Sequence, residues 1–330
     1  MSNREIEIIN LEKRYPDDVL AVDGVSLHVD AGQIYGFLGP NGAGKSTTVK
    51  ILTTLALPTA GTATVGGYDV VKEAGEVRRI AGVALQDVGL DPLMKSLELL
   101  TLQGRLFGAG RQEARVRAEE LLRLVGLEEA KERQVGTYSG GMKRRLDLAL
   151  ALVHEPEILF LDEPTTGLDP VSRRDVWREV RRLNEELGMT IFLTTQYLEE
   201  ADELADMISI IDKGQIVKTG SPAALKASLG KESLNLAFEN RENAEAANEL
   251  LAQTAERTQL DRVTLRVYRA DIARAIPHIM EQLHDAGLDP VSLTLTQPTL
   301  DDVFLQVTGS AYEAEAAASQ AQPGSMAVSD

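Results

Sequence analysis

Hydrophobic and polar positions alternate near the start of the chain in a way that predicts β-strands. Apolar and polar residues alternate over 25–29, as in a strand with one buried face. A second apolar run, over 33–38, is stopped by Gly39. After Lys45 the apolar residues follow helical spacing as far as Leu55. The local order around residue 40 is therefore strand, glycine-rich loop and helix.

The middle of the chain predicts helices first and buried parallel strands afterwards. Residues 96–133 are rich in Leu, Arg and Glu with helical periodicity and contain no good strand, which indicates a helical insertion. Residues 157–161 and 190–194 are continuous apolar runs, typical of central strands covered on both faces. Residues 171–187 have the length and periodicity of a crossover helix between them.

A β-hairpin is predicted near the end of the first domain. Two strand-like runs, 207–212 and 215–219, are joined by Lys213 and Gly214, a pair that suits a tight turn. We expect the first domain to span residues 4–228.

A second, smaller α/β domain is predicted for residues 231–309. Its strands and helices are expected at 233–239, 243–253, 262–268, 271–284 and 291–296. A last helix opens at Thr299, where Asp302 stands three places on, close to a capping box. Residues 310–330 are rich in Ala, Ser and Gln without apolar periodicity, and we expect them to be disordered.

Composition excludes several classes of function. The 330 residues include 34 Lys and Arg against 51 Asp and Glu, a net charge of −17, which disfavours sequence-independent binding to DNA or RNA. The absence of cysteine excludes disulfides, thiol nucleophiles, zinc clusters and iron–sulfur sites. No apolar run approaches the length of about 18 residues that a membrane-spanning helix needs, and we expect no signal peptide.

One segment matches the phosphate-binding pattern G-x-x-x-x-G-K-[ST]. Glycines let successive backbone N–H groups turn towards a polyphosphate, and the following helix adds its positive end. A glycine-rich turn that merely begins a helix is the alternative, but the flanking strand and helix favour the phosphate loop. The residues expected to bind the nucleotide are Gly39, Pro40, Asn41, Gly42, Ala43, Gly44, Lys45, Ser46 and Thr47.

Two acidic residues, Asp162 and Glu163, follow the apolar strand predicted at 157–161. Ligands in open α/β sheets bind beyond the carboxyl ends of such strands. Adjacent strand residues point to opposite sides, so the two carboxylates are expected to have different roles. Asp162, together with the Ser46 hydroxyl, is assigned to Mg²⁺, and Glu163 to the attacking water. A solvated loop or helix cap is the alternative, which the phosphate loop in the same chain disfavours.

A Ser-Gly-Gly sequence precedes another predicted helix. Ser139 is expected to cap that helix, with Gly140 and Gly141 giving close access to its backbone. Taken alone, this is an ordinary capped helix start. The basic residues 143–145 are assigned to a solvated or phosphate-proximal face.

These three motifs, in this order and spacing, resemble the nucleotide-binding subunit of ATP-binding-cassette (ABC) transporters over about residues 4–225. The resemblance implies a P-loop NTPase fold with a mixed sheet core, an antiparallel β subdomain and a helical insertion at about 92–150, followed here by the small C-terminal α/β domain. It also implies that Tyr15 stacks on adenine, that Gln86 is the lid glutamine near Mg²⁺, that residues 139–141 are the signature, and that Asp169 belongs to the loop that meets a partner subunit. Asp169 is also expected to cap the helix that begins at Pro170.

The sequence departs from the usual family pattern at the signature and at the switch histidine. Tyr138 and Met142 stand where the family usually has Leu and Gln, and Gln196 stands where it has His. A glutamine amide can donate a hydrogen bond to the γ-phosphate, but it cannot gain a proton near pH 6.5. The combination is similar to the daunorubicin-resistance branch of ABC exporters. Residues 299–305 resemble the C-terminal segment of that branch, which extends the resemblance to about residue 309.

The resemblance implies an ATPase that powers export of a drug, antibiotic or lipid-like substrate through a separate membrane permease. Two copies are expected to bind ATP and Mg²⁺ between them head to tail, on the cytoplasmic face of the membrane, with Glu163, Gln196 and Lys45 as the catalytic residues. An importer ATPase and a soluble ABC ATPase acting on nucleic acid are the alternatives. The single phosphate loop, the lack of cysteine and the acidic charge disfavour the second. The role of the C-terminal domain is left open: it could stabilise the dimer, bind the permease, sense the substrate or serve only for packing.

Overall fold

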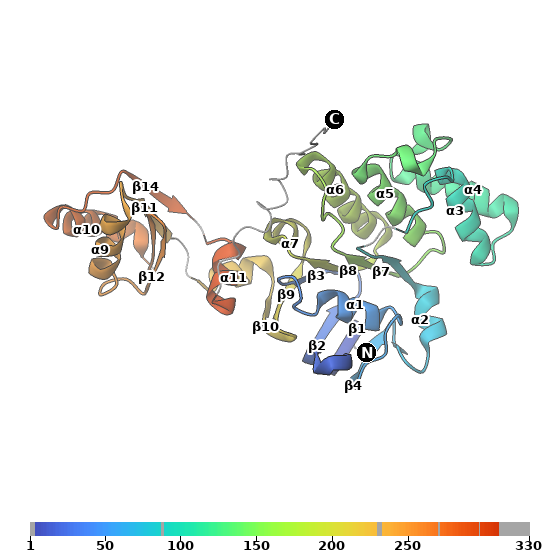
Figure 1. Cartoon of the computed structure of the whole chain (residues 1–330), viewed down its shortest axis with the longest axis horizontal. Coiled ribbons are helices and arrows are strands. Elements are labelled where there is room, and N and C mark those ends of the chain that lie inside the picture. The colour runs from blue at the N-terminus through green and yellow to red at the C-terminus, as the bar shows by residue number, and fades with distance from the viewer. Residues whose placement is uncertain (1–3, 87–88, 230–232, 270, 297, 310–330) are drawn as a thin grey trace, which may run out of the picture. The chain divides into compact units, whose positions relative to one another are not determined.

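The computed structural model describes residues 4–86, 89–229, 233–269, 271–296 and 298–309 (Figure 1). The chain divides after Pro222 into two units, which are described separately. Residues 310–330, where a disordered tail is predicted, lie outside the described residues. In the described part of the chain, no helix combines the length and the apolar character needed to cross a membrane.

The first unit contains an antiparallel sheet of four strands built mainly from the N-terminal residues. In sheet order its strands are β2 (Leu20–Asp30), β1 (Arg4–Arg14), β4 (Ala60–Val65) and β5 (Tyr68–Asp69). Along β2 the residues Val25, Leu27 and Val29 are buried and those between them are exposed. The predicted strand with one buried face is therefore confirmed.

A mixed sheet of six strands forms the centre of the first unit. In sheet order its strands are β10 (Gln215–Gly220), β9 (Met207–Asp212), β3 (Ile34–Leu38), β8 (Thr190–Thr195), β7 (Ile158–Asp162) and β6 (Ala81–Ala84). All neighbours are parallel except β10, which pairs with β9 antiparallel. Every residue of β3, β7 and β8 is buried, as predicted for strands covered on both faces.

Helices cover both faces of the six-stranded sheet. In Figure 1, α1 lies on one side of β3, β8 and β7, and α5, α6 and α7 lie on the other. The bounds of these helices are α1 (Lys45–Leu52), α5 (Gly140–Ala151), α6 (Pro170–Leu187) and α7 (Leu198–Leu204). Two further short elements of the first unit are the 3-10 turn η1 (Pro16–Asp18) and the helix α2 (Ala74–Ile80). Two apolar cores result, one on each face of the sheet.

The helix after the phosphate loop is shorter than predicted. It ends at Leu52, and the side chain of Leu55 is 59% exposed. Thr54 adopts a left-handed backbone conformation with φ 63°, and the N–H groups of Leu55 and Ala56 both donate to the carbonyl of Lys50. The apolar spacing continued past this helix end, so the assignment of Leu55 to the helix was wrong.

The predicted helical insertion and hairpin are both present. The insertion comprises α3 (Ser96–Leu106), α4 (Arg111–Leu124) and the 3-10 turns η2 (Glu128–Ala130) and η3 (Val135–Thr137), followed by α5. In the hairpin, Lys213 has φ 49° and Gly214 has φ 83°. Positive φ at both turn residues matches the twist of the paired strands β9 and β10.

The second unit is a four-stranded antiparallel sheet with two helices that share its apolar core. Its elements run in the order α8 (Pro222–Ala227), β11 (Ser233–Ala237), α9 (Arg241–Leu251), β12 (Arg257–Asp261), β13 (Thr264–Tyr268), α10 (Ile272–Asp285), β14 (Ser292–Thr296) and α11 (Leu300–Thr308). From β11 to β14 this is the βαββαβ order of ferredoxin-like folds, with sheet order β12-β13-β11-β14.

The sequence pattern did not predict one strand of the second unit. It predicted a single strand over 262–268, whereas the structure has β12 and β13 paired as a hairpin, with Arg262 in its turn at φ 52°. Residues 257–259 are polar, and β12 lies at an edge of the sheet, half-buried. An edge strand needs little apolar sequence, and so it lacked the alternation that identified the other strands.

Candidate nucleotide-binding site

The glycine-rich loop joins the carboxyl end of β3 to the amino end of α1. Gly42 has φ 79° and Gly44 has φ 106°. A Cβ on Gly44 would lie 2.3 Å from the carbonyl oxygen of Ala21, whereas one on Gly42 would meet no heavy atom within 4 Å. The loop thus packs closely at Gly44 and is open at Gly42, and beside it lies the start of α1, whose first N–H groups have no acceptor within the helix. This arrangement fits a polyphosphate.

Lys45 is held across the loop and is 4% exposed. Its Nζ donates to the carbonyl oxygens of Gly39 at 2.8 Å and Pro40 at 3.0 Å. The same nitrogen lies 3.1 Å from Oε1 of Glu163. The structure therefore brings the loop lysine and the acid after β7 into one ion pair.

Ser46 and Asp162 also meet. The Ser46 hydroxyl donates to Oδ1 of Asp162 at 3.0 Å, and the Thr194 hydroxyl donates to the same oxygen at 2.6 Å. Asp162 is 2% exposed. A hydroxyl and a carboxylate oxygen side by side are hard oxygen ligands, which fit a Mg²⁺ that keeps water and phosphate oxygens as its other ligands. Among the described residues, no group of three or more His, Asp or Glu side chains is placed to hold a metal.

Gln86, the third residue assigned to Mg²⁺, lies on the exposed segment after β6. Within the described residues it forms no hydrogen bond with Ser46 or Asp162. The structure thus brings together two of the three residues assigned to the metal.

Glu163 follows β7 directly in a left-handed backbone conformation, with φ 48°. Its N–H donates to the carbonyl and the hydroxyl of Thr194, both at 3.1 Å. Its Oε2 accepts a hydrogen bond from the Thr166 hydroxyl at 3.1 Å, while Oε1 faces Lys45. The two neighbouring carboxylates therefore have different partners, Asp162 on the Ser46 side and Glu163 on the Lys45 side.

Gln196 and Tyr15 flank this centre. Gln196 is half-buried in the turn between β8 and α7, at the same sheet edge as Glu163, and the N–H of Gly39 donates to the carbonyl of Thr195 just before it. Tyr15 precedes η1 and is 36% exposed, with the Nζ of Lys13 lying 5.1 Å from its ring centroid. Its ring is thus accessible to a ligand.

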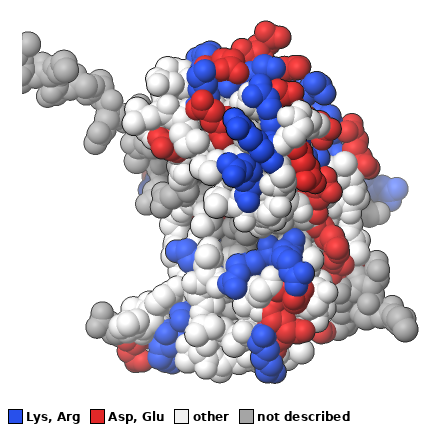
Figure 2. All heavy atoms as spheres, turned by 90° about the vertical axis from the view of Figure 1, so that its right-hand side faces the viewer, with Lys and Arg blue, Asp and Glu red and all other residues white. Residues whose placement is uncertain are grey.

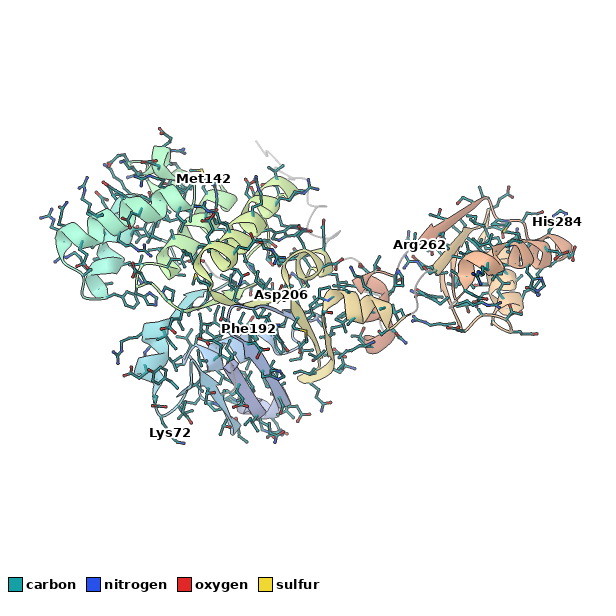
Figure 3. All side chains as sticks on the ribbon, turned by 180° about the vertical axis from the view of Figure 1, so that it is seen from behind. Lys72, Met142, Phe192, Asp206, Arg262 and His284 are labelled. Atoms are coloured by element: carbon teal, nitrogen blue, oxygen red, sulfur yellow. The ribbon has the colours of Figure 1, made fainter. Side chains whose placement is uncertain are left out.

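The Ser-Gly-Gly sequence forms the start of α5. Ser139 caps the helix, its hydroxyl accepting from the N–H of Met142 at 3.3 Å, which confirms the predicted cap. Ser139 and Gly140 are exposed, but a Cβ on Gly141 would lie 2.7 Å from Oγ of Ser172 on α6. Gly141 thus allows α5 and α6 to pack closely. In Figure 3, Met142 lies among the helices, apart from Phe192 in β8.

Asp169 caps α6, as predicted. Its Oδ1 accepts hydrogen bonds from the N–H groups of Val171 and Ser172, both at 3.0 Å, and its Oδ2 accepts from the Ser172 hydroxyl at 2.6 Å. These hydrogen bonds, that of the Ser172 hydroxyl first, lower the pKa of Asp169. The side chain is exposed and remains ionised at neutral pH.

The sequence pattern did not predict the burial of two charged residues near the centre. Arg144 is 4% exposed, so it does not lie on a solvated face, which was one of the two placements expected for it. Its spacing shows why it is buried, because it falls on the same helix face as the buried Gly141 and Leu148. Glu200 is fully buried, accepts from the Thr165 hydroxyl and the Trp177 indole at 2.8 Å each, and has its pKa raised by burial.

Two family profiles match the chain. The profile described as "ABC transporter" matches residues 22–166, and the profile described as "ATP-binding protein DrrA1-3-like, C-terminal domain" matches residues 220–308. The first covers the phosphate loop, the signature and Glu163, and the second covers the ferredoxin-like unit.

Curated proteins match almost the whole length. The daunorubicin resistance ATP-binding protein DrrA3 of Streptomyces coeruleorubidus is 45% identical over 94% of this chain and 97% of its own. The daunorubicin/doxorubicin resistance ATP-binding protein DrrA of Streptomyces peucetius is 46% identical over 93% of each chain. The Nod factor export ATP-binding protein I of Burkholderia orbicola is 40% identical over 94% of this chain and 98% of its own.

A solved structure matches about two thirds of the chain. A dimeric ATP-binding cassette in a post-hydrolysis state, bound to ADP and Pi, superposes with a TM-score of 0.60 and 27% identity, covering 66% of this chain and 98% of that one. The predicted fold class of an ABC nucleotide-binding domain is confirmed.

Proposed function

Because the chain belongs to the ATP-binding proteins of ABC transporters and is an ATPase of that family, we propose that it powers export of a drug, antibiotic or lipid-like substrate through a separate permease. Two of the relatives are named for resistance to daunorubicin and one for export of Nod factor. Those names support the export direction, and their variety leaves the choice of substrate to the permease.

The observation that carries the proposal is the pair of contacts linking the phosphate loop to the end of β7. Ser46 contacts Asp162, and Lys45 contacts Glu163, all four side chains coming from the two segments that the motifs predicted. In the proposed site Ser46 and Asp162 would hold Mg²⁺, which would neutralise part of the phosphate charge. Lys45 and the N–H groups at the start of α1 bind the β- and γ-phosphates.

Glu163 is the proposed catalytic acid–base group and Gln196 its neighbour at the γ-phosphate. Glu163 orients and polarises the attacking water, so that the barrier falls mainly by positioning and charge stabilisation. The Gln196 amide donates a hydrogen bond without changing its charge. Gln86 approaches the site from the segment after β6, and the Tyr15 ring stacks on adenine.

We propose that two copies complete each other's sites. The phosphate loop precedes α1 on one face of the six-stranded sheet, whereas the signature begins α5 on the other face (Figure 1). Ser139 and Gly140 are exposed and therefore accessible to a nucleotide held by a second copy. Asp169, at the exposed start of α6, lies in the loop that would meet that copy.

The permease contact is assigned to a groove beside the helical insertion. The groove has a volume of about 500 Å³ and is lined by residues of α3 and α4, by the segment around His154 and by Arg79. The rings of Phe107 and His154 stack in it at 4.1 Å, and Phe107 is 47% exposed. Figure 2 looks onto this side of the molecule, where basic side chains gather in groups with a stripe of acidic ones beside them.

A groove lined by both aromatic and charged side chains suits a short amphipathic segment of a permease. Through that contact the chain would be held at the cytoplasmic face of the membrane.

The dimer is tested by sedimentation of the purified chain. The Glu163→Gln variant with Mg-ATP should sediment as a dimer, because it binds the nucleotide without cleaving it. The same variant carrying Ser139→Arg should stay monomeric, because the added side chain blocks the signature. A Glu163→Gln protein that binds Mg-ATP and stays monomeric would contradict the proposed mechanism.

Export is tested in cells that co-produce the chain with candidate permeases from its own gene neighbourhood. Cells with the wild-type chain should accumulate less of a fluorescent anthracycline than cells with Glu163→Gln. Drug export would be contradicted if the two kinds of cells accumulated equal amounts of the anthracycline, and equal amounts of other amphipathic drugs, with every candidate permease present in the membrane.

A further inference from the structure

Arg144 donates from a buried position to three segments of the first unit. Its Nε donates to the carbonyl oxygen of Pro164 at 2.9 Å and its Nη2 to that of Asp162 at 3.1 Å. Its Nη1 donates to the carbonyl of Leu85 at 2.6 Å and to Oδ2 of Asp147 at 2.9 Å. The side chain is 5% exposed. One guanidinium thus connects α5 with the end of β7 and with the segment that leads to Gln86.

The chemistry of these contacts requires a guanidinium. Arginine offers five N–H donors in a rigid plane, whereas lysine offers three donors from one point. Hydrogen bonds from a charged donor are stronger than neutral ones, and burial removes competition from water. Lysine at this position would keep the charge but could not reach Leu85, Asp162 and Pro164 together.

Two of the three carbonyls lie on either side of Glu163. The left-handed backbone of Glu163 is unfavourable for a residue with a Cβ and persists only where its surroundings hold it. Arg144 holds the carbonyl before it and the carbonyl after it, and Thr194 holds its N–H. The direction in which the Glu163 carboxylate leaves the main chain is therefore set by these contacts.

We propose that Arg144 is a positioning residue for ATP hydrolysis, which fixes Glu163 beside Lys45 and ties it to the segment before Gln86. The proposal rests on the role given to Glu163 under the proposed function. Arg144 itself is buried on the α5 side of β7 and acts on the reaction only through the main chain around Glu163.

The first test is the steady-state kinetics of Arg144→Lys, which keeps the positive charge, and of Arg144→Gln, which removes it. The kcat for ATP should fall 10- to 100-fold, while KM and the affinity for Mg-nucleotide change less than threefold, because the phosphate loop is intact. The matched control is Arg145→Lys, since Arg145 donates to the carbonyl of Val125, away from the site. Its kcat should stay within twofold of wild type.

The second test separates positioning from general stability. In the Glu163→Gln background, Arg144→Lys should lower the residual rate by less than twofold, because the group it positions is already gone. A full further loss of 10-fold or more would mean that Arg144 acts elsewhere, and it would overturn the proposal. Unchanged kcat in both single variants of Arg144 would also overturn it.

A third variant keeps the carbonyl contacts and is informative even where Arg144 variants fold poorly. Asp147→Asn removes the carboxylate partner and leaves the bonds to Leu85, Asp162 and Pro164, so kcat should stay within threefold of wild type. A loss as large as that of Arg144→Lys would contradict the assignment to the carbonyls. Absence of ATP turnover in the wild-type chain would instead refute the proposed function itself.

Discussion

The two units of the chain each bury a carboxylate in a polar cluster, but the clusters are built differently. In the first unit Asp162 and Glu163 meet Ser46 and Lys45, which come from a loop of glycines with open space at Gly42. A phosphate can replace a carboxylate as the partner of Lys45, and a metal ion can become the partner of Ser46 and Asp162. The contacts within the cluster can therefore be exchanged for contacts with a ligand.

In the second unit the cluster around Asp302 is closed. Oδ1 of Asp302 accepts from the Arg266 guanidinium and from the Tyr268 hydroxyl, the latter at 3.0 Å. Oδ2 accepts from the N–H and hydroxyl of Thr299, both at 2.9 Å. Asp302 is 2% exposed, and these contacts fasten the start of α11 to β13.

A buried charge therefore indicates a binding site only where its partners can be replaced. Asp302 and Asp162 are equally buried, and both lie next to a hydroxyl donor. What separates them is the adjoining glycine loop and helix start, which supply donors for an anion. The following predictions test that distinction by asking whether each cluster controls turnover or stability.

The largest effect is expected from Glu163→Gln. ATP turnover should fall at least 100-fold, which corresponds to about 2.7 kcal/mol in the barrier, while ATP binding and thermal stability stay close to wild type. Steady-state ATPase rates and nucleotide titration measure the two. The control is Glu199→Gln, an exposed acid at the start of α7. A near-normal rate in Glu163→Gln would show that this carboxylate is not the catalytic group.

The converse effect is expected from Asp302→Ala. The free energy of unfolding of the second unit should fall by about 2 kcal/mol, because the variant leaves the donors of Arg266, Tyr268 and Thr299 without their acceptor. The ATPase rate of the isolated chain should change less than twofold. Denaturant unfolding is the measurement, with the exposed Glu281→Ala as control. A large loss of turnover with normal stability in Asp302→Ala would show that this cluster controls turnover and not stability.

A smaller effect concerns Tyr268 and alkaline pH. Burial, and then the charge of Asp302, raises the pKa of Tyr268 to about 12. Because the folded chain holds this proton more tightly than the unfolded chain, stability is lost as pH rises from about 10 towards 12. At pH 11 the loss from this group should be about 1 kcal/mol.

Tyr268→Phe should therefore be less stable than wild type at pH 8 by about 1 kcal/mol, through loss of the hydrogen bond to Asp302. The gap between the two proteins should close above pH 11. Unfolding curves at both pH values check this, and a constant gap would refute the role given to the phenol proton.

The smallest effect is expected at Gln196. A glutamine cannot titrate, so the pH–rate profile of the wild-type chain should lack any step that belongs to this position. Gln196→His should introduce one near pH 6.5, changing the rate a few-fold across it. Superimposable profiles that both contain this step would show that another group produces it.

Much of the candidate site could be predicted from contiguous residues. The phosphate loop, the acids after β7, the caps at Ser139 and Asp169 and the hairpin turn at Lys213 each depend on a few neighbouring residues. The structure places them at one sheet edge or at helix starts, as their chemistry requires. Local hydrogen bonding and the conformational freedom of glycine suffice to define such features.

Features that depend on distant parts of the chain were not predictable in this way. Arg144 was interpreted as one of three surface cations, and its partners, the carbonyls of Asp162 and Pro164, come from a distant segment that only the tertiary structure identifies. Strand β12 has no apolar alternation and forms because β13 lies beside it. The end of α1 before Leu55 likewise depends on the left-handed turn at Thr54.

The amino-acid sequence alone determined which residues could be assigned to the site: a phosphate loop, a pair of acids and a signature, whose residue types suit the groups that we propose they bind. The tertiary structure decided which of these residues meet, that the loop helix and the signature helix lie on opposite faces of the sheet, and how Glu163 is held between two carbonyls bound by Arg144. The reason is physical. Hydrogen-bonding capacity belongs to a residue, whereas burial and distance belong to pairs of residues far apart in the chain.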